Sequence, residues 1–187
     1  MENKRHQISI AGEPGTGKTT ARNRLQQKLG YPVHNNGEYG RALCEKMGYP
    51  FKDYEKFMKD FPQMDQVIDE SCVQAAYDNT NLIIDARLGW HFVPNSFKVF
   101  LTCDLPEAAR RIFNDTERNE SYSSLEECET IAKKRFDDEN ARFMEKYGVS
   151  NATRSQFDLV VDTTHLSKEE VVDEILKGYE AWLKEPA

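Results

Sequence analysis

The feature that most constrains this chain is a glycine-rich stretch near its amino terminus, where residues 12–19 read GEPGTGKT. The preceding residues 7–11 (QISIA) form a short β-branched run that predicts a strand. The following residues 18–29 have helical spacing and stop at Gly30, a residue suited to ending a helix. Between a strand and a helix, such a turn aims backbone N–H groups and the helix dipole at one point. The stretch therefore fits G-x-x-x-x-G-K-[ST], the phosphate-binding P-loop.

Two side chains of this loop have expected chemical roles. The Lys18 ammonium group reaches the β- and γ-phosphates of a bound nucleotide, and the Thr19 hydroxyl is an oxygen ligand suited to Mg²⁺. A glycine-rich turn without any ligand is the alternative, but the flanking strand and helix favour phosphate binding. The residues expected to hold the donor nucleotide are Gly12, Gly15, Thr16, Gly17, Lys18, Thr19 and Thr20.

Short apolar runs alternate with helical segments along the whole chain. Strands are predicted at residues 7–11, 31–34, 82–85, 97–101 and 158–162, and the main helices at 18–29, 106–114, 124–147 and 167–183. Strands this apolar are typical of parallel strands that are covered on both faces. The pattern predicts a single α/β domain over residues 1–187, with a three-layer α/β/α arrangement around a five-stranded parallel sheet. Residues 38–79, helical in pieces, and residues 115–124 are expected to be insertions.

Composition excludes several classes of protein. Of the 187 residues 39% are hydrophobic, enough for a core, and the net charge of −7 argues against a partner that is a nucleic acid polymer. Since no run approaches the roughly 18 apolar residues of a membrane span, no membrane association is expected. The four cysteines are far apart in the sequence, which favours a reduced, cytoplasmic protein over a zinc or disulfide site.

A carboxylate and a guanidinium group follow the strand predicted at residues 82–85. Asp85 ends that strand, and Arg87 lies two residues later. Because the carboxyl ends of parallel strands share one edge of a sheet, we expect Asp85 on the Mg²⁺ side of the phosphate site, acting directly or through water. Arg87 would point into the same crevice, and Arg41, at the start of the first insertion, could hold a second phosphate. A strand-ending aspartate beside a surface arginine is the alternative.

Arginines also recur at helical spacing. Arg111 and Arg118 are seven residues apart, and so are Arg135 and Arg142, a spacing that places both members of a pair on one helix face. Planar guanidinium groups fixed around a phosphoryl group stabilise the negative charge in the transition state of its transfer. The alternative for each arginine is a solvated helix face, with Arg135 paired to Glu139.

Together these residues resemble the nucleoside monophosphate kinases, and among them the short cytidylate kinases of the archaeal type. The stretches that carry the likeness are residues 12–20, 37–41, 85–90 (DARLGW), 129–147 and 161–172, so it covers nearly the whole chain. The resemblance implies a P-loop NTPase fold in which residues 38–79 form a helical acceptor-binding insert and residues 115–124 a small lid.

The resemblance also assigns roles to particular positions. The residues implied to act on the transferring phosphoryl group are Lys18, Arg111 (or its neighbour Arg110), Arg118, Arg135 and Arg142. Those implied to bind the acceptor are Arg41 and Arg87 at its phosphate and Asp65 and Asp69 at its base. Thr19 and Asp85 would hold the metal.

The implied activity is Mg²⁺-dependent transfer of the γ-phosphoryl group of ATP to a pyrimidine nucleoside monophosphate, CMP or dCMP, by a cytoplasmic monomer whose partners are small nucleotides. The chain departs from the family pattern at Asn35, where serine is usual, at Glu38, where aspartate is usual, at Gln66, where arginine is expected, and at Ala86, where glycine is usual. The departures at positions 35–38 and 66 bear on recognition of the acceptor.

Two other functions remain open at this point. A kinase for another monophosphate or for a small metabolite alcohol could use the same scaffold, although an alcohol would need a base, for which Asp85 is the placed candidate. A nucleotide-binding regulator without catalysis is the third possibility. The intact Lys18, Thr19 and arginine set argues against that regulator.

Overall fold

The computed structural model describes residues 6–115 and 122–185 of the chain, and its centre is one parallel sheet. The strands are β1 (His6–Gly12), β2 (Val33–Asn35), β3 (Asn81–Asp85), β4 (Phe97–Thr102) and β5 (Leu159–Asp162). Their order in the sheet is β2-β3-β1-β4-β5, and every pairing is parallel. The predicted α/β fold with a five-stranded parallel sheet is therefore confirmed.

Helices fill the connections between these strands. The α-helices are α1 (Lys18–Leu29), α2 (Asn36–Lys46), α3 (Tyr54–Asp60), α4 (Met64–Asp78), α5 (Gly89–Phe92), α6 (Leu105–Phe113), α7 (Leu125–Tyr147) and α8 (Lys168–Lys184). Two 3-10 turns, η1 (Phe51–Asp53) and η2 (Arg154–Gln156), complete the described elements. None of the helices in these ranges combines the length and the apolar composition that a membrane crossing requires.

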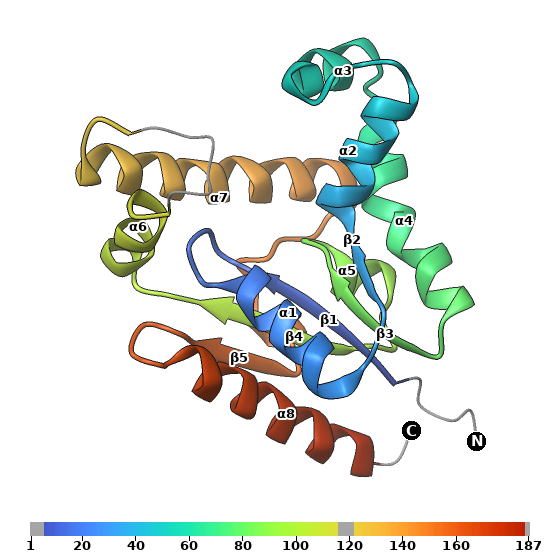
Figure 1. Ribbon diagram of the computed structural model, residues 1–187, viewed down its shortest axis with the longest axis vertical. Helices are drawn as coiled ribbons and strands as arrows, with labels where there is room; N and C mark the ends of the chain where they lie inside the picture. Colours follow the sequence, from blue (N-terminus) through green and yellow to red (C-terminus); the bar gives the residue numbers. More distant parts are fainter. Residues whose placement is uncertain (1–5, 116–121, 186–187) are drawn as a thin grey trace.

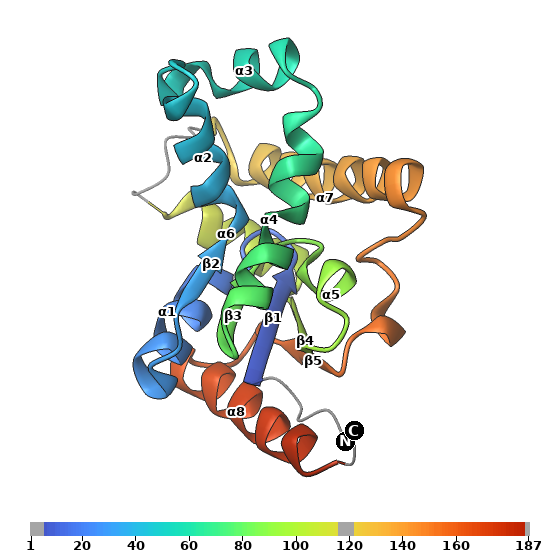
Figure 2. The same cartoon turned by 90° about the vertical axis from the view of Figure 1, so that its right-hand side faces the viewer.

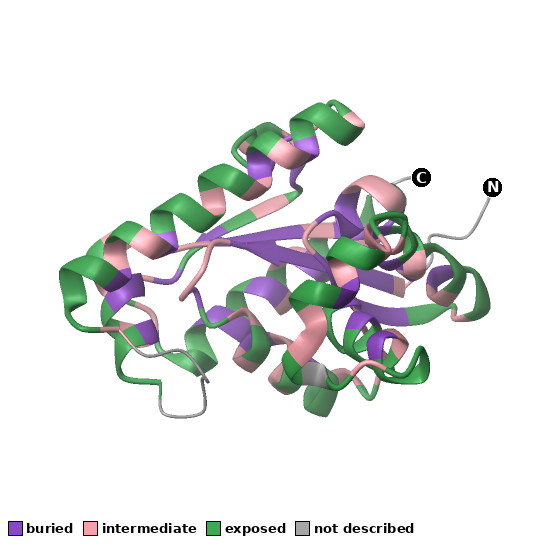
Figure 3. Ribbon diagram, turned by 90° about the horizontal axis from the view of Figure 1, so that it is seen from above, coloured by how far each residue is buried: buried purple, intermediate pink, exposed green. Residues whose placement is uncertain are grey.

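The sheet lies between two layers of helices, as Figures 1 and 2 show. On one face α1 and α8 pack against the strands, with Leu25 and Ile175 fully buried against Ile8 and Val99. On the other face α4, α5 and the carboxyl half of α7 cover the strands, where Phe143 packs against Phe100. Figure 3 shows the consequence, a buried sheet between helices whose outer faces are exposed. Burial on both faces explains why the strands read as apolar runs.

Strand order creates a crevice at the carboxyl edge of the sheet. β1 has β3 as its neighbour on one side and β4 on the other, so the chain crosses over β1 between these two strands. Loops that follow β1 and β3 diverge at such a switch point, which is where ligands bind to open α/β sheets. The glycine-rich loop between β1 and α1 lies at this point (Figure 1).

The segment predicted at residues 38–79 is indeed helical in pieces. It consists of α2, η1, α3 and α4, which stand together at one end of the molecule in Figures 1 and 2. Gly40 of α2 allows this packing, because a Cβ atom there would lie 2.7 Å from the Tyr54 hydroxyl and 3.1 Å from Ile68. The second expected insertion, residues 115–124, falls largely outside the described ranges.

Some predicted boundaries differ from the structure. The second strand is residues 33–35 rather than 31–34, because Pro32 cannot donate to the ladder and contributes only its carbonyl, which accepts from Ile83 N at 2.9 Å. α6 ends at Phe113, two residues after Arg111, and Arg118 lies outside the described residues. The short helix α5 was not predicted, since four residues are too few to show a helical period.

Candidate functional site

The loop after β1 has the backbone geometry of an anion-binding turn. Gly15 and Gly17 both have positive φ values, 79° and 77°, which direct successive N–H groups toward one side of the loop. Helix α1 begins at Lys18, and its N-cap Gly17 offers no side chain to the first amide groups. The amides at the start of α1 are therefore directed toward the crevice with the positive end of the helix dipole.

Gly15 also sets the distance between this loop and α6. A Cβ atom at this position would lie 2.6 Å from the carbonyl oxygen of Ala108, a contact that real Cβ atoms essentially never make. Glycine is thus required here both by its backbone conformation and by the closeness of a second backbone. The loop is packed closely against the first turn of α6.

Asp85, at the end of β3, receives hydrogen bonds from three side chains. Lys18 Nζ lies 3.0 Å from Oδ1, while Arg22 Nη1 and Asn35 Nδ2 lie 3.2 and 2.7 Å from Oδ2. Asn35 reaches it because β2 and β3 pair in a register that makes the two residues direct partners. Only 4% of Asp85 is exposed. A buried carboxylate of this kind needs such paired donors, and they fix its orientation.

This arrangement fits a magnesium ion at the edge of the loop. The Thr19 hydroxyl lines the cavity described below, and the Asp85 carboxylate lies beside Lys18, so hard oxygen ligands are present. Both oxygens of Asp85 already accept from cationic or amide donors. Asp85 is therefore suited to bind the ion through water, or to release Lys18 to a phosphate when a nucleotide enters.

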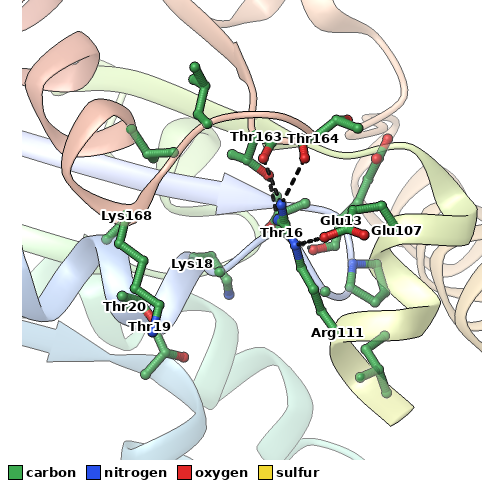
Figure 4. A pocket seen from close by; sticks show the side chains of 18 of the residues that line it. Glu13, Thr16, Lys18, Thr19, Thr20, Glu107, Arg111, Thr163, Thr164 and Lys168 are labelled. Carbon is green, nitrogen blue, oxygen red and sulfur yellow. Dashed lines mark hydrogen bonds and ion pairs between the residues drawn. The ribbon is translucent and has the colours of Figure 1, made fainter. Parts of the chain in front are cut away.

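A single cavity of about 1410 Å³ joins the loop to arginines from several other elements. It is lined by the whole stretch Gly12–Ala21, by Arg41, Arg87, Arg110, Arg111 and Arg135, and by residues 163–169 after β5. Figure 4 shows Lys18, Thr19 and Arg111 among the side chains that line this space. The predicted donor-binding residues, both predicted acceptor arginines and the predicted Arg111 and Arg135 thus share one cavity.

Arg111 binds the loop that follows β5. Its guanidinium group donates to the carbonyl oxygens of Thr163 and Thr164 at 2.7 and 3.2 Å, and to Glu107 at 2.8 Å (Figure 4). Arg110 also pairs with Glu107, and these two arginines lower the pKa of that carboxyl to about 2. In this structure Arg111 therefore joins α6 to the loop after β5, and both line the cavity. Arg118 lies outside the described residues.

Three further arginines that line the cavity come from three different elements. Arg41 comes from α2, Arg87 from the segment after β3, and Arg135 from α7. Arg87 forms an ion pair with Glu139 of α7. From helical spacing alone, Glu139 was the alternative partner of Arg135. Anions that enter the cavity would therefore compete with Glu139 for Arg87.

The remaining predicted residues form a separate cluster between α4 and α7. Arg142 pairs with Asp65, Lys146 Nζ lies 2.9 Å from the same carboxylate, and the Tyr147 hydroxyl donates to Asp69 at 3.0 Å. Burial raises the pKa of Asp69. None of these five residues is among those that line the cavity. In this structure the cluster joins α4 to α7, and Arg142 is directed toward Asp65.

Sequence reasoning missed several partners in the site. Arg22 stands one helical turn after Lys18, so both cations reach Asp85, a relationship that the i, i+4 spacing could have revealed. The pairing of Glu139 with Arg87, and that of Arg154 with Glu13 of the loop, depend on long-range contacts that carry no local signal. Lys168, at the start of α8, lines the cavity close to the loop (Figure 4).

Known proteins with similar sequences identify the family. The family described as AAA domain matches residues 8–132, which include the loop and strands β1 to β4. A cytidylate kinase of Thermoplasma volcanium is 30% identical over 170 residues, which is 88% of this chain and 86% of that protein. The chain belongs to this P-loop kinase family. It is thus an enzyme of the nucleoside monophosphate kinase group, as its motifs predicted.

Two other comparisons extend this finding. An S-adenosylmethionine-dependent nucleotide dehydratase of Lacinutrix mariniflava is 33% identical over 174 residues, covering 92% of this chain but 36% of that protein. The chain therefore spans about a third of that relative's length. The structure of the shikimate kinase of Aquifex aeolicus matches with a TM-score of 0.62 at 18% identity, covering 95% of this chain and 98% of that one. The latter likeness supports the kinase fold.

Proposed function

We propose that this protein is a cytoplasmic, monomeric enzyme that transfers the γ-phosphoryl group of ATP to CMP or dCMP with the help of Mg²⁺. One observation carries the proposal: a P-loop and arginines from three further elements, Arg41, Arg87 and Arg135, line one cavity. The P-loop with its lysine is suited to the phosphates of the donor, and the arginines are suited to the phosphate of an acceptor.

Donor binding follows from the loop. The glycine backbone and the start of α1 would cradle the α- and β-phosphates, while Lys18 would leave Asp85 for the β- and γ-phosphates. Mg²⁺, when bound, would neutralise charge on the β- and γ-phosphates. Thr19 and Asp85 are the residues of this chain that would hold it.

Transfer itself needs positioning rather than acid–base chemistry. An oxygen of the acceptor phosphate attacks the γ-phosphorus, the bond from that phosphorus to the β–γ bridging oxygen breaks, and ADP leaves. The acceptor phosphate is already ionised near pH 7, so no base is required. Arg41 and Arg87 would orient it, and Arg135 would stabilise charge on the transferring group.

An alcohol acceptor is less well supported by the geometry. Such an acceptor needs a base to take its proton, and Asp85 is the candidate for that base. Because Lys18, Arg22 and Asn35 all donate to its two oxygens, an acceptor hydroxyl would have to compete with these donors for the carboxylate. The activity named for the dehydratase relative is not supported either, since the similarity covers 36% of that protein.

The choice of a cytosine base rests on the cytidylate kinase relatives, one of which reaches 30% identity. Asp65 and Asp69 remain our proposal for recognition of the base, which requires their present partners on α7 to shift when the acceptor binds. Two of the departures from the family pattern have local roles in this structure. Asn35 caps α2 by accepting from Glu38 N at 2.8 Å, and Gln66 donates to Glu70 on the exposed face of α4.

A coupled assay of ADP release tests the proposal. The protein with Mg²⁺ and ATP is offered CMP, dCMP, UMP, AMP, GMP and dTMP in turn, with a blank that contains no acceptor. We expect CMP or dCMP to stimulate release far above the others, and Lys18→Ala to abolish it in a folded protein. Equal release in every sample, the blank included, would instead favour a nucleotide-binding regulator.

A further inference from the structure

The P-loop, whose backbone favours anions, contains a carboxylate side chain, that of Glu13. Glu13 directly follows Gly12, and its own backbone N–H does not face the cavity but donates to Leu101 O of β4 at 3.1 Å. A negative side chain at this position opposes the binding of a polyphosphate, unless its charge is held away or neutralised. The P-loop pattern leaves this position open, so the pattern itself gives glutamate no role.

Both oxygens of the Glu13 carboxylate are occupied on the β4 side of the loop. Oε2 accepts from the Thr102 hydroxyl at 2.9 Å and from the Cys103 amide at 3.4 Å. Oε1 forms an ion pair with the guanidinium group of Arg154. The side chain keeps 21% of its exposure, so the carboxylate is largely withdrawn from water and its partners act in a medium of reduced dielectric.

Arg154 is held in place from three directions. Its guanidinium carbon lies 3.8 Å from the centroid of the Phe100 ring, the stacking arrangement that guanidinium groups favour. A second arm of the group donates to the backbone carbonyl of Asn151. Since 141 positions separate Arg154 from Glu13 in the sequence, the folded chain alone brings the two together.

The segment that carries Arg154 is anchored to α7 by buried polar groups. Asn140 of α7 accepts from the Asn151 amide at 2.8 Å and from the Ser150 hydroxyl at 3.1 Å. The Trp90 indole donates to the Asn151 side chain at 2.7 Å. Arg154 therefore approaches the P-loop from a fixed position, and it links the loop to the helix that carries Arg135.

We infer that Arg154 is a positioning residue of the nucleotide site, which neutralises the Glu13 carboxylate and holds the P-loop against β4. Removal of the guanidinium group leaves a partly buried carboxylate without its cationic partner, beside the place where the polyphosphate would bind. Nucleotide affinity should then fall because of the charge on Glu13, and removal of that charge should restore it. The inference rests on the proposed function only in that the P-loop binds a nucleotide.

The test measures the dissociation constant of ADP with Mg²⁺ by calorimetry, and the thermal unfolding midpoint of each variant. Arg154→Met keeps an apolar stem against Phe100 and should weaken binding about tenfold, the effect of about 1.4 kcal/mol. Glu13→Gln combined with Arg154→Met should bind within about threefold of the wild type. The matched control is Lys28→Met, which removes the same charge from the exposed pair with Asp173 and should change binding less than about twofold.

The outcomes are distinguishable. An Arg154→Met protein that binds ADP like Lys28→Met overturns the inference, and so does a double variant as weak as Arg154→Met, because the arginine would then act through packing alone. Arg154→Lys is the milder variant if the methionine protein does not fold. It keeps a positive charge near Glu13, so a loss of about tenfold there also overturns the inference. A wild-type protein that binds no ADP contradicts the proposed function instead.

Discussion

Replacing Gly15 by alanine tests whether the P-loop depends on its close contact with α6. Two separate effects act at this position. The backbone φ of 79° is unfavourable for any residue with a side chain, and the added Cβ atom would lie 2.6 Å from the carbonyl oxygen of Ala108. Gly30, which ends α1, isolates the first effect, because it has a φ of 68° and nothing within 4 Å of the added atom.

The magnitudes follow from these two positions. Gly30→Ala should destabilise the protein by about 1 kcal/mol, the cost of a left-handed conformation for alanine after the gain from a stiffer unfolded chain. Gly15→Ala adds an overpacking cost of about 1–3 kcal/mol, because the contact is with backbone and cannot be relieved by a rotamer change. For a chain of this size, 1 kcal/mol lowers the unfolding midpoint by about 2–4 °C.

Thermal unfolding with and without ADP is the assay. Gly30→Ala should lower the midpoint by about 2–4 °C and retain the stabilisation by ADP. Gly15→Ala should lower it by about 4–16 °C and lose most of that stabilisation, since the loop must move to accommodate the methyl group. Equal midpoints for the two variants, with ADP binding intact in both, would refute the reasoning that α6 holds the loop in its binding conformation.

Three further predictions concern the charged side chains of the site. Arg22→Ala should reduce kcat about 10- to 100-fold and raise the Mg²⁺ concentration for half-maximal activity, because Asp85 loses a donor. Arg22→Lys should recover part of the activity, and an unchanged Mg²⁺ dependence would exclude this role of Arg22. Arg87→Ala should raise KM for the acceptor about 30-fold, the effect of about 2 kcal/mol, and leave KM for ATP unchanged; the reverse pattern would place Arg87 on the donor side. Because Arg110 and Arg111 lower the folded-state pKa of Glu107 from 4.5 to about 2, its contribution to stability is present above about pH 4.5 and is lost as the pH falls toward about 2. Glu107→Gln should therefore be less stable than the wild type at pH 7 and lose this part of the acid dependence in denaturant titrations; identical acid dependence of the two proteins would contradict it.

The sequence predicted the conformation of the P-loop well, because that conformation is local. The strand, the glycine turn and the helix that contain Lys18 are contiguous, so the backbone conformation follows from residues that are neighbours in the chain. The alternation of apolar strands with helices similarly predicted the parallel sheet that the structure shows. Asp85 could be placed near Lys18 because carboxyl ends of parallel strands share an edge.

The sequence did not reveal which charged side chains form ion pairs with one another. Glu139 pairs with Arg87 from a different element, although Arg135 stands at helical spacing on its own helix. Arg142 pairs with Asp65 of α4, a contact that the sequence did not indicate, and its action on a phosphoryl group stays a prediction. Such choices depend on how α4 and α7 pack, and periodicity reports which face of a helix is apolar but not which side chain it meets.

The most direct test of the account follows the phosphoryl group itself. ATP labelled with ³²P at its γ-phosphate is incubated with Mg²⁺, CMP and the protein, and the products are separated by thin-layer chromatography. We predict that the label appears in CDP, in an amount equal to the ADP formed, and that Lys18→Ala yields neither product. Label found in inorganic phosphate alone, with unlabelled CMP recovered intact, would contradict the claim that this cavity joins a donor and an acceptor phosphate.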